Sequence, residues 1–215
     1  MSFLNQLKSQ ASALQNQQQT QHESLAANTL QVENACKTVQ HYFTDLARQL
    51  NVIVPAAPRF TLDGKTPWPA MKLVDFRVDA RRKMLRDKEA FDVLSIGWEV
   101  VPQLGKPVGG VVSANFPPDL ERIQARLSAG NVQHERKEVR HPEKNTLQAY
   151  RYEYITQTRG SVMVRPDHDK GTLAFRVANA DGFGVANVAL PAAQVQTGLL
   201  DELAKLIVAQ PSTFL

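Results

Sequence analysis

The first fifty residues of the chain contain neither proline nor glycine, and the first proline is Pro55. Because the apolar residues of this stretch follow a seven-residue repeat, it predicts one long helix with a coiled-coil-like seam. The run from Gln15 to Gln21 has no apolar residue, so the seam is interrupted in its middle. The two seam positions read Leu4, Ala11, Gln18, Leu25, Val32, Val39, Leu46 and Leu7, Leu14, Gln21, Asn28, Ala35, Tyr42, Gln49.

The two halves of this helix differ in the width of their apolar stripe. From Leu25 onward the stripe is wide, as a helix needs in order to lie on a sheet or on other helices. Before Gln15 it is narrow. We therefore expect residues 25–50 to dock on a folded body and residues 1–22 to project as an arm. A continuous helix of this length would span roughly 70 Å at ~1.5 Å per residue, longer than the body could cover.

The rest of the chain predicts a connector and a compact body. Prolines spread over residues 51–70 indicate an extended connector, with residues 52–54 tucked inward. From Met71 the hydrophobic period becomes two, which is typical of strands with one solvated face. Residues 71–215 therefore predict an α+β body: a mostly antiparallel sheet of about seven or eight strands, with two further helices packed on one face. Residues 79–90 fit a helix as well as a strand and turn.

Composition limits the class of protein. The 215 residues are 43% hydrophobic and 21% charged, which is ordinary for a soluble globular chain. No run approaches the ~20 apolar residues that span a bilayer, and the start lacks the pattern of a secretory signal. The lone Cys36 cannot form an internal disulfide, which favours a reducing compartment. We expect a cytoplasmic protein with no membrane association.

The excess positive charge gathers in one segment. The net charge is +4, and residues 72–89 hold seven cations against four anions. This segment is the best candidate for nucleic-acid contact, but its interleaved carboxylates would dilute a field aimed at phosphates. A solvated strand face is the competing interpretation. The candidate contact residues are Arg77, Arg81, Arg82, Lys83, Arg86 and Lys88.

Three tyrosines form a second candidate surface. Tyr150, Tyr152 and Tyr154 alternate along a predicted strand and therefore share one face. They can line the buried side of the sheet and pair across strands. Alternatively they present a ligand or interaction face, because tyrosine offers rigid amphipathic area.

Signatures of catalysis and cofactor binding are weak. The tripeptide at residues 64–66 resembles the end of a phosphate-binding loop, but the first glycine of that motif is missing and Pro67 prevents the helix that must follow. Two histidines and an Asp-His-Asp turn lack the count and spacing of metal ligands. Cys36 lies among apolar neighbours, unlike a nucleophile. We predict no catalytic residue, cofactor or metal, and whether the chain is an enzyme stays open, with the balance against it.

These patterns favour an interaction or assembly protein. We expect the N-terminal helix to self-associate or to bind a partner through Leu4, Leu7, Ala11 and Leu14, because nothing else in the chain is an obvious cover for that seam. The first alternative is a small-ligand site between the sheet and the C-terminal helix, formed by the tyrosine face and small residues near Gly110. The second is nucleic-acid binding through residues 77–88.

Overall fold

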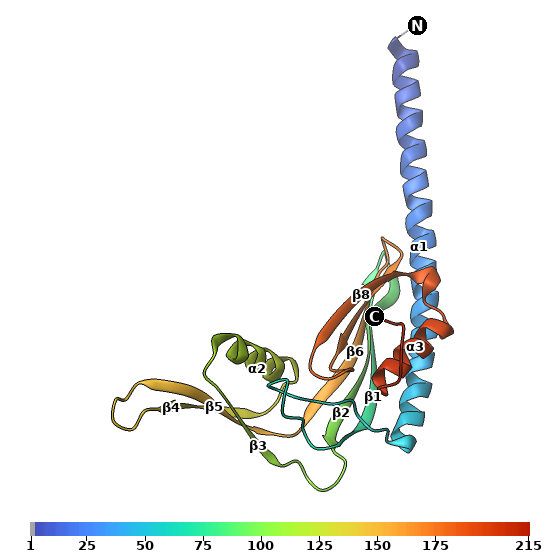
Figure 1. Ribbon diagram of the computed structural model, residues 1–215. Coiled ribbons are helices and arrows are strands. Elements are labelled where there is room, and N and C mark those ends of the chain that lie inside the picture. The colour runs from blue at the N-terminus through green and yellow to red at the C-terminus, as the bar shows by residue number, and fades with distance from the viewer. Residues whose placement is uncertain (1–2) are drawn as a thin grey trace.

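A computed structural model describes residues 3–215, with the backbone alone for residues 4–6 and 9. It is an α+β fold, as the sequence predicts, with a long N-terminal helix and eight strands (Figure 1). A single 3₁₀ turn, η1, precedes the last helix. The elements in order are α1 Phe3–Ile53, β1 Met71–Leu85, β2 Lys88–Pro102, β3 Gly109–Ala114, α2 Pro117–Ala129, β4 His134–Arg140, β5 Leu147–Ile155, β6 Thr158–Asp167, β7 Thr172–Ala178, β8 Val185–Pro191, η1 Ala192–Gln194 and α3 Thr197–Ile207.

The strands form two antiparallel sheets rather than one. The larger has five strands in the order β1-β2-β6-β7-β8, and the smaller has three in the order β3-β5-β4. The chain passes from the small sheet back to the large one through residues 156–157, between β5 and β6. In Figure 1 the β4–β5 hairpin extends away from the five-stranded sheet. Short hairpins join β1 to β2, β4 to β5, β6 to β7 and β7 to β8, whereas β2–β6 and β3–β5 are antiparallel pairs of strands that are distant in the chain.

Residues 79–90 form strand and turn, so the helical alternative is wrong. Leu85 pairs with Lys88, which leaves a two-residue loop between β1 and β2. Both loop residues, Arg86 and Asp87, have positive φ angles of 49° and 62°. That is the backbone of a type I′ turn, whose twist matches a hairpin. The backbone pairing of β1 with β2, which runs from Met71 to Leu85, outweighs the helix propensity of these residues.

Helix α1 packs on one face of the five-stranded sheet through its second half, and α3 lies beside it (Figure 1). Val32, Cys36, Val39 and Phe43 are fully buried at this contact, and Leu50 is 5% exposed. Burying each such aliphatic or aromatic side chain contributes about 1.5–3 kcal/mol. These residues recur every three or four positions, which keeps one face of the helix on the sheet. The second half of α1 is therefore part of the core.

The connector supplies core residues as well. Phe60, Leu62 and Trp68 are buried, and they belong to one core cluster that includes residues of both sheets. The helix continues to Ile53, and Val52 and Ile53 are 81% and 65% exposed. The expectation that residues 52–54 tuck inward was wrong, because the helix carries them past the edge of the sheet before the chain turns at Pro55.

Helix α2 covers the three-stranded sheet instead of the five-stranded one. Ile123 and Leu127 are its buried residues, and Gln124 Nε2 donates a hydrogen bond of 3.0 Å to Tyr152 Oη on β5. Its C-terminal end is fixed where the Oγ1 hydroxyl of Thr158 donates to the carbonyl of Gly130. The fold therefore has helices on both sheets, with the arm of α1 free of either.

Candidate helix-binding surface on α1

The first part of α1 stands away from the body (Figure 1). Every side chain between residues 10 and 24 is exposed, and Leu7 and Leu14 are 45% and 60% exposed. Ala11 is exposed between them, and the side chain of Leu4 lies outside the described part of the chain. We call residues 3–24 the arm. Three of the four seam residues that the sequence singles out are thus open to solvent.

Two hairpin tips hold α1 where the arm leaves the body. Asn28 Nδ2 donates a hydrogen bond of 2.7 Å to the carbonyl of Asp169, at the tip between β6 and β7. Arg86, at the tip between β1 and β2, donates from Nη1 to Thr29 Oγ1 at 3.1 Å and forms an ion pair with Asp169. Both tips therefore contact the same turn of the helix, on the side that faces the sheet.

A buried polar cluster fixes the helix one turn further along. Glu33 Oε1 accepts a hydrogen bond of 2.8 Å from the amide of Phe91, and His168 Nε2 lies 2.8 Å from the carbonyl of the same residue. Because a carbonyl can only accept, His168 donates from Nε2. Among the described residues its buried Nδ1 has no hydrogen-bond partner. Burial, followed by the nearby Glu33 carboxylate, raises the pKa of the Cys36 thiol to about 12.

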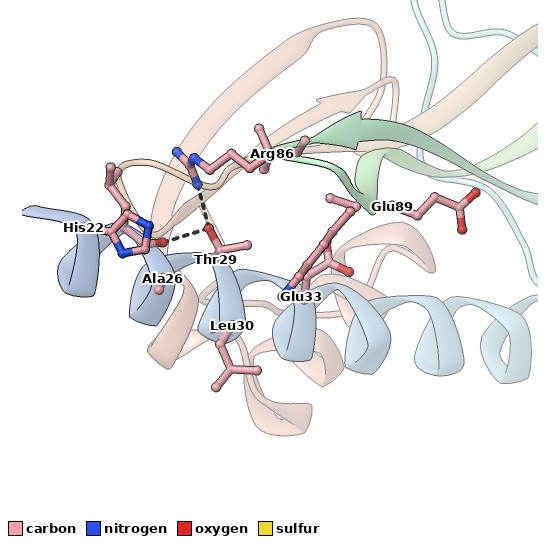
Figure 2. A pocket seen from close by; sticks show the side chains of 11 residues that line it. His22, Ala26, Thr29, Leu30, Glu33, Arg86 and Glu89 are labelled. Carbon is pink, nitrogen blue, oxygen red and sulfur yellow. Dashed lines mark hydrogen bonds between the residues drawn. The ribbon is translucent and has the colours of Figure 1, made fainter.

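A groove of about 460 Å³ opens beside this cluster, between α1 and the β1–β2 hairpin. Figure 2 shows Thr29 and Arg86 joined across it, with His22 toward the arm and Glu89 on the far rim. The apolar part of its lining comes from both walls. We call it the root groove, and its apolar residues are Leu25, Ala26, Leu30, Leu85 and Ala90.

The tyrosine face is packed rather than open. Tyr152 is 1% and Tyr154 9% exposed, and the Tyr154 ring stacks on Trp68 with centroids 5.6 Å apart. A Cβ atom on Gly110 would lie 2.4 Å from Tyr154 Cζ, so this ring fills the space that the glycine leaves. Tyr150 is half-buried, beneath the guanidinium of Arg136 at 4.9 Å. These rings therefore line the buried side of their sheet, which is the first of the two interpretations that the sequence allowed.

The tyrosines also lie in a different sheet from the one that α3 covers. They belong to the three-stranded sheet with α2, whereas α3 packs with α1 on the five-stranded sheet. Within the described part of the chain, they therefore do not share a pocket with the C-terminal helix. The ligand site expected between those two elements gains no support from this arrangement.

The basic segment is largely paired with carboxylates. Five of its six candidate cations take part in ion pairs, and most of these are exposed, so they neutralise charge more than they stabilise the fold. Paired cations release fewer counterions on meeting phosphate, and the segment gains no support as a nucleic-acid surface. The ion pairs are Arg77–Asp75, Arg81–Asp79, Arg82–Glu89, Lys83–Asp92 and Arg86–Asp169.

The remaining motifs have structural explanations. The amides of Lys65 and Thr66, which a phosphate would need, donate to the carboxylate of Asp63 at 2.8 and 2.7 Å. Burial opposes ionisation of Asp63, but these hydrogen bonds outweigh it and lower its pKa to about 2. Within residues 3–215, no three His, Cys, Asp or Glu side chains gather as metal ligands would. Residues 64–66 therefore form a capped turn.

The contacts at the root of the arm were not predicted from the sequence. A signal was present, because Asn28 is a polar residue at a seam position and Glu33 lies next to the fully buried Val32. Polar residues beside a buried stripe commonly mark specific hydrogen bonds. Their partners, Asp169 and the amide of Phe91, are distant in sequence and could not be read from the pattern.

Comparisons of the chain with models of protein families, with curated proteins and with solved structures found no match. Across residues 3–215, none of the helices combines the length and the apolar character that crossing a bilayer requires. The most distinctive geometry of the chain lies at the arm and its root.

Proposed function

We propose that the chain is a non-catalytic interaction protein whose arm binds another helix, either from a second copy or from a partner protein. The observation that carries this proposal is the exposure of Leu7 and Leu14 on one face of a helix that stands away from the body. Exposed leucines at seven-residue spacing on one helix face are typical of a coiled-coil seam. Because no described part of the body covers Leu7 and Leu14, a helix of another chain is the cover that we propose.

The energetics of isolated helices support the same proposal. Most helical stability in proteins comes from packing of an apolar face, and the side chains of residues 10–24 have no such packing on the body. The arm carries only Lys8 and Glu23 as charged residues, so ion pairs along the helix add little. Burying a leucine against a partner would add about 1.5–3 kcal/mol. A partner helix that covers the exposed leucines would thus also stabilise the arm as a helix.

A cytoplasmic location is part of the proposal. Cys36 is a free, buried thiol in the core contact between α1 and the sheet. An unpaired cysteine is common where the compartment keeps thiols reduced. Fractionation of the source cells, with immunodetection of the chain, checks this part separately.

The test compares two double variants of the full chain. Leu7→Glu with Leu14→Glu puts two charges on the seam. Ala13→Glu with Thr20→Glu adds the same charges at the same spacing on the opposite face of the helix. Sedimentation velocity at increasing concentration and co-purification from the source cells should both show loss of association for the seam variant alone. If the two variants and the unmodified chain behave alike in both assays, the proposal is wrong.

A further inference from the structure

The seam of the arm lies on the same line of the helix as the stripe that packs on the sheet. Leu7, Leu25 and Phe43 are spaced by eighteen residues, which is five full turns at 3.6 residues per turn. Leu14, Val32 and Leu50 are spaced in the same way. Because α1 is one continuous helix from Phe3 to Ile53, the exposed leucines point to the side on which the sheet lies further down.

This alignment limits which helix can occupy the seam. At the root, the hairpin tips with Arg86 and Asp169 contact α1 on the seam side, at Asn28 and Thr29. A helix lying along the seam has to end there. A second copy in parallel orientation would continue past this point to its own Ile53, into the space that the first copy's sheet fills. The parallel pairing that is usual for a long seam is therefore sterically blocked.

We propose, on the basis of the function proposed above, that the occupant of the seam is the arm of a second copy in antiparallel orientation. Its N-terminal tip then reaches the root groove, and its own body lies at the opposite end. The arm is about 33 Å long at ~1.5 Å per residue, so each arm spans the other from tip to root. Such a two-fold interface is isologous and closes on itself as a dimer.

The alternation of seam positions sets the register. In an antiparallel pair, residues of the first seam position (Ala11, Gln18 and Leu25) face residues of the second (Leu7, Leu14 and Gln21). When the two arms overlap fully, residues whose numbers add to 32 lie opposite each other. Leu7 then packs against Leu25, Ala11 against Gln21 and Leu14 against Gln18. Leu25 is half-buried at the mouth of the groove, so Leu7 extends its apolar surface. Gln21 lays its CH2 groups over the smaller Ala11, and Gln18 lays its CH2 groups over the branched Leu14. Both side-chain amides stay at the edge of the interface.

The shape of the tip agrees with this register. Phe3 is 73% exposed at the tip and comes level with Thr29, where the apolar walls of the groove begin (Figure 2). The groove is thus the receptor for the tip of the second arm.

Cysteine crosslinking of the full chain tests the orientation and the register together. The variant carries Ala11→Cys and Gln21→Cys, both exposed seam positions that leave every leucine in place. Within one chain these residues are about 15 Å apart along the helix, beyond the 4.4–6.8 Å that a disulfide allows between Cα atoms. Cys36 is buried and does not compete. In the matched control, Ser12→Cys with Thr20→Cys, the residue numbers also add to 32. The two cysteines are therefore level in the proposed dimer, but they lie outside the seam.

After mild oxidation, peptide mapping by mass spectrometry should find a disulfide between residues 11 and 21 of different chains, at several-fold higher yield than for the control pair. Disulfides from 11 to 11 and from 21 to 21 would overturn the proposal in favour of parallel arms. A chain that stays monomeric but loses a co-purifying protein in the Leu7→Glu, Leu14→Glu variant would overturn the second copy as occupant, while the helix-binding function would stand. Equal behaviour of all variants would overturn both.

Discussion

The two halves of α1 are parts of one helix and carry leucines on one line, yet only one of them is covered. Leu50 is 5% exposed and Leu14 is 60% exposed, although they lie ten turns apart on the same face. The difference comes from what stands opposite: the sheet covers the second half and ends at the hairpin tips with Arg86 and Asp169. The comparison teaches that the apolar repeat by itself does not distinguish a core contact from an intermolecular one.

The largest expected difference between the halves is in thiol reactivity. The pKa of Cys36 is raised from 9.0 to about 12, so its thiolate fraction at pH 8 is about a thousandfold below that of an ordinary thiol. A cysteine at the exposed Ala13 should react at the ordinary rate. Labelling of the Ala13→Cys chain, followed by mass spectrometry, should show that Cys36 reacts at least about a hundredfold more slowly than the new cysteine, because burial also blocks access to the thiol. In denaturant the ratio should fall to near one, and a small ratio in the native chain would break the comparison.

A leucine-to-alanine pair measures the same difference as stability. Leu50→Ala should lower the free energy of unfolding by about 2–5 kcal/mol, because it leaves a cavity between α1 and the sheet. Leu14→Ala should change it by less than about 0.5 kcal/mol at concentrations where the chain is monomeric. Urea denaturation followed by near-ultraviolet circular dichroism measures both. Equal losses would mean that the arm packs on its own body.

The polar cluster at Glu33 should have a smaller effect. Glu33→Ala removes the acceptor of the buried amide of Phe91, which should cost about 1–3 kcal/mol. Glu33→Gln keeps an acceptor oxygen in the same place and serves as the control, with a smaller loss. The measurement is again denaturation of the monomer. If Glu33→Ala left the free energy of unfolding unchanged, apolar packing alone would fix the helix on the sheet.

The smallest expected effect is that of charge changes at the flank of the seam. In the antiparallel register Lys8 of one arm and His22 of the other flank the seam on the same side, so His22→Glu should lower the dissociation constant by up to about fivefold, since exposed pairs contribute about 0.2–1 kcal/mol. Adding Lys8→Glu should remove this gain. Sedimentation equilibrium at low salt measures both variants. Failure of the second change to remove the gain would contradict the register.

Much of the fold could be predicted from local patterns. The absence of proline and glycine before Pro55 predicted α1, and the change to a period of two at Met71 predicted the strands of an α+β body. The sequence does not decide between a helix and the turn at Arg86 and Asp87, because non-glycine residues with positive φ are hard to recognise in a sequence. The division into two sheets depends on long-range register, such as Val112 with Tyr152, which local periodicity does not encode.

The candidate site was predicted in part for the same reason. The seam at Leu7 and Leu14 follows from spacing, and so does the shared face of the tyrosines. Whether a face is covered depends on elements distant in the chain: Trp68 covers Tyr154, and Asp169 contacts Asn28. The ion pairs of the basic segment could be anticipated only where the partner is two residues away, as for Arg77 and Asp75. The root groove, built from α1 and the β1–β2 hairpin, had no sequence signature.

Amide hydrogen exchange along α1 at two chain concentrations tests the central claim most directly. We predict that amides in residues 10–24 are protected at high concentration and exchange rapidly on dilution, because the arm is stabilised by a second copy. Amides in residues 32–50 should exchange slowly and equally at both concentrations, since the sheet covers them in every molecule. Equal protection of the arm at both concentrations, whether high or low, would contradict the account.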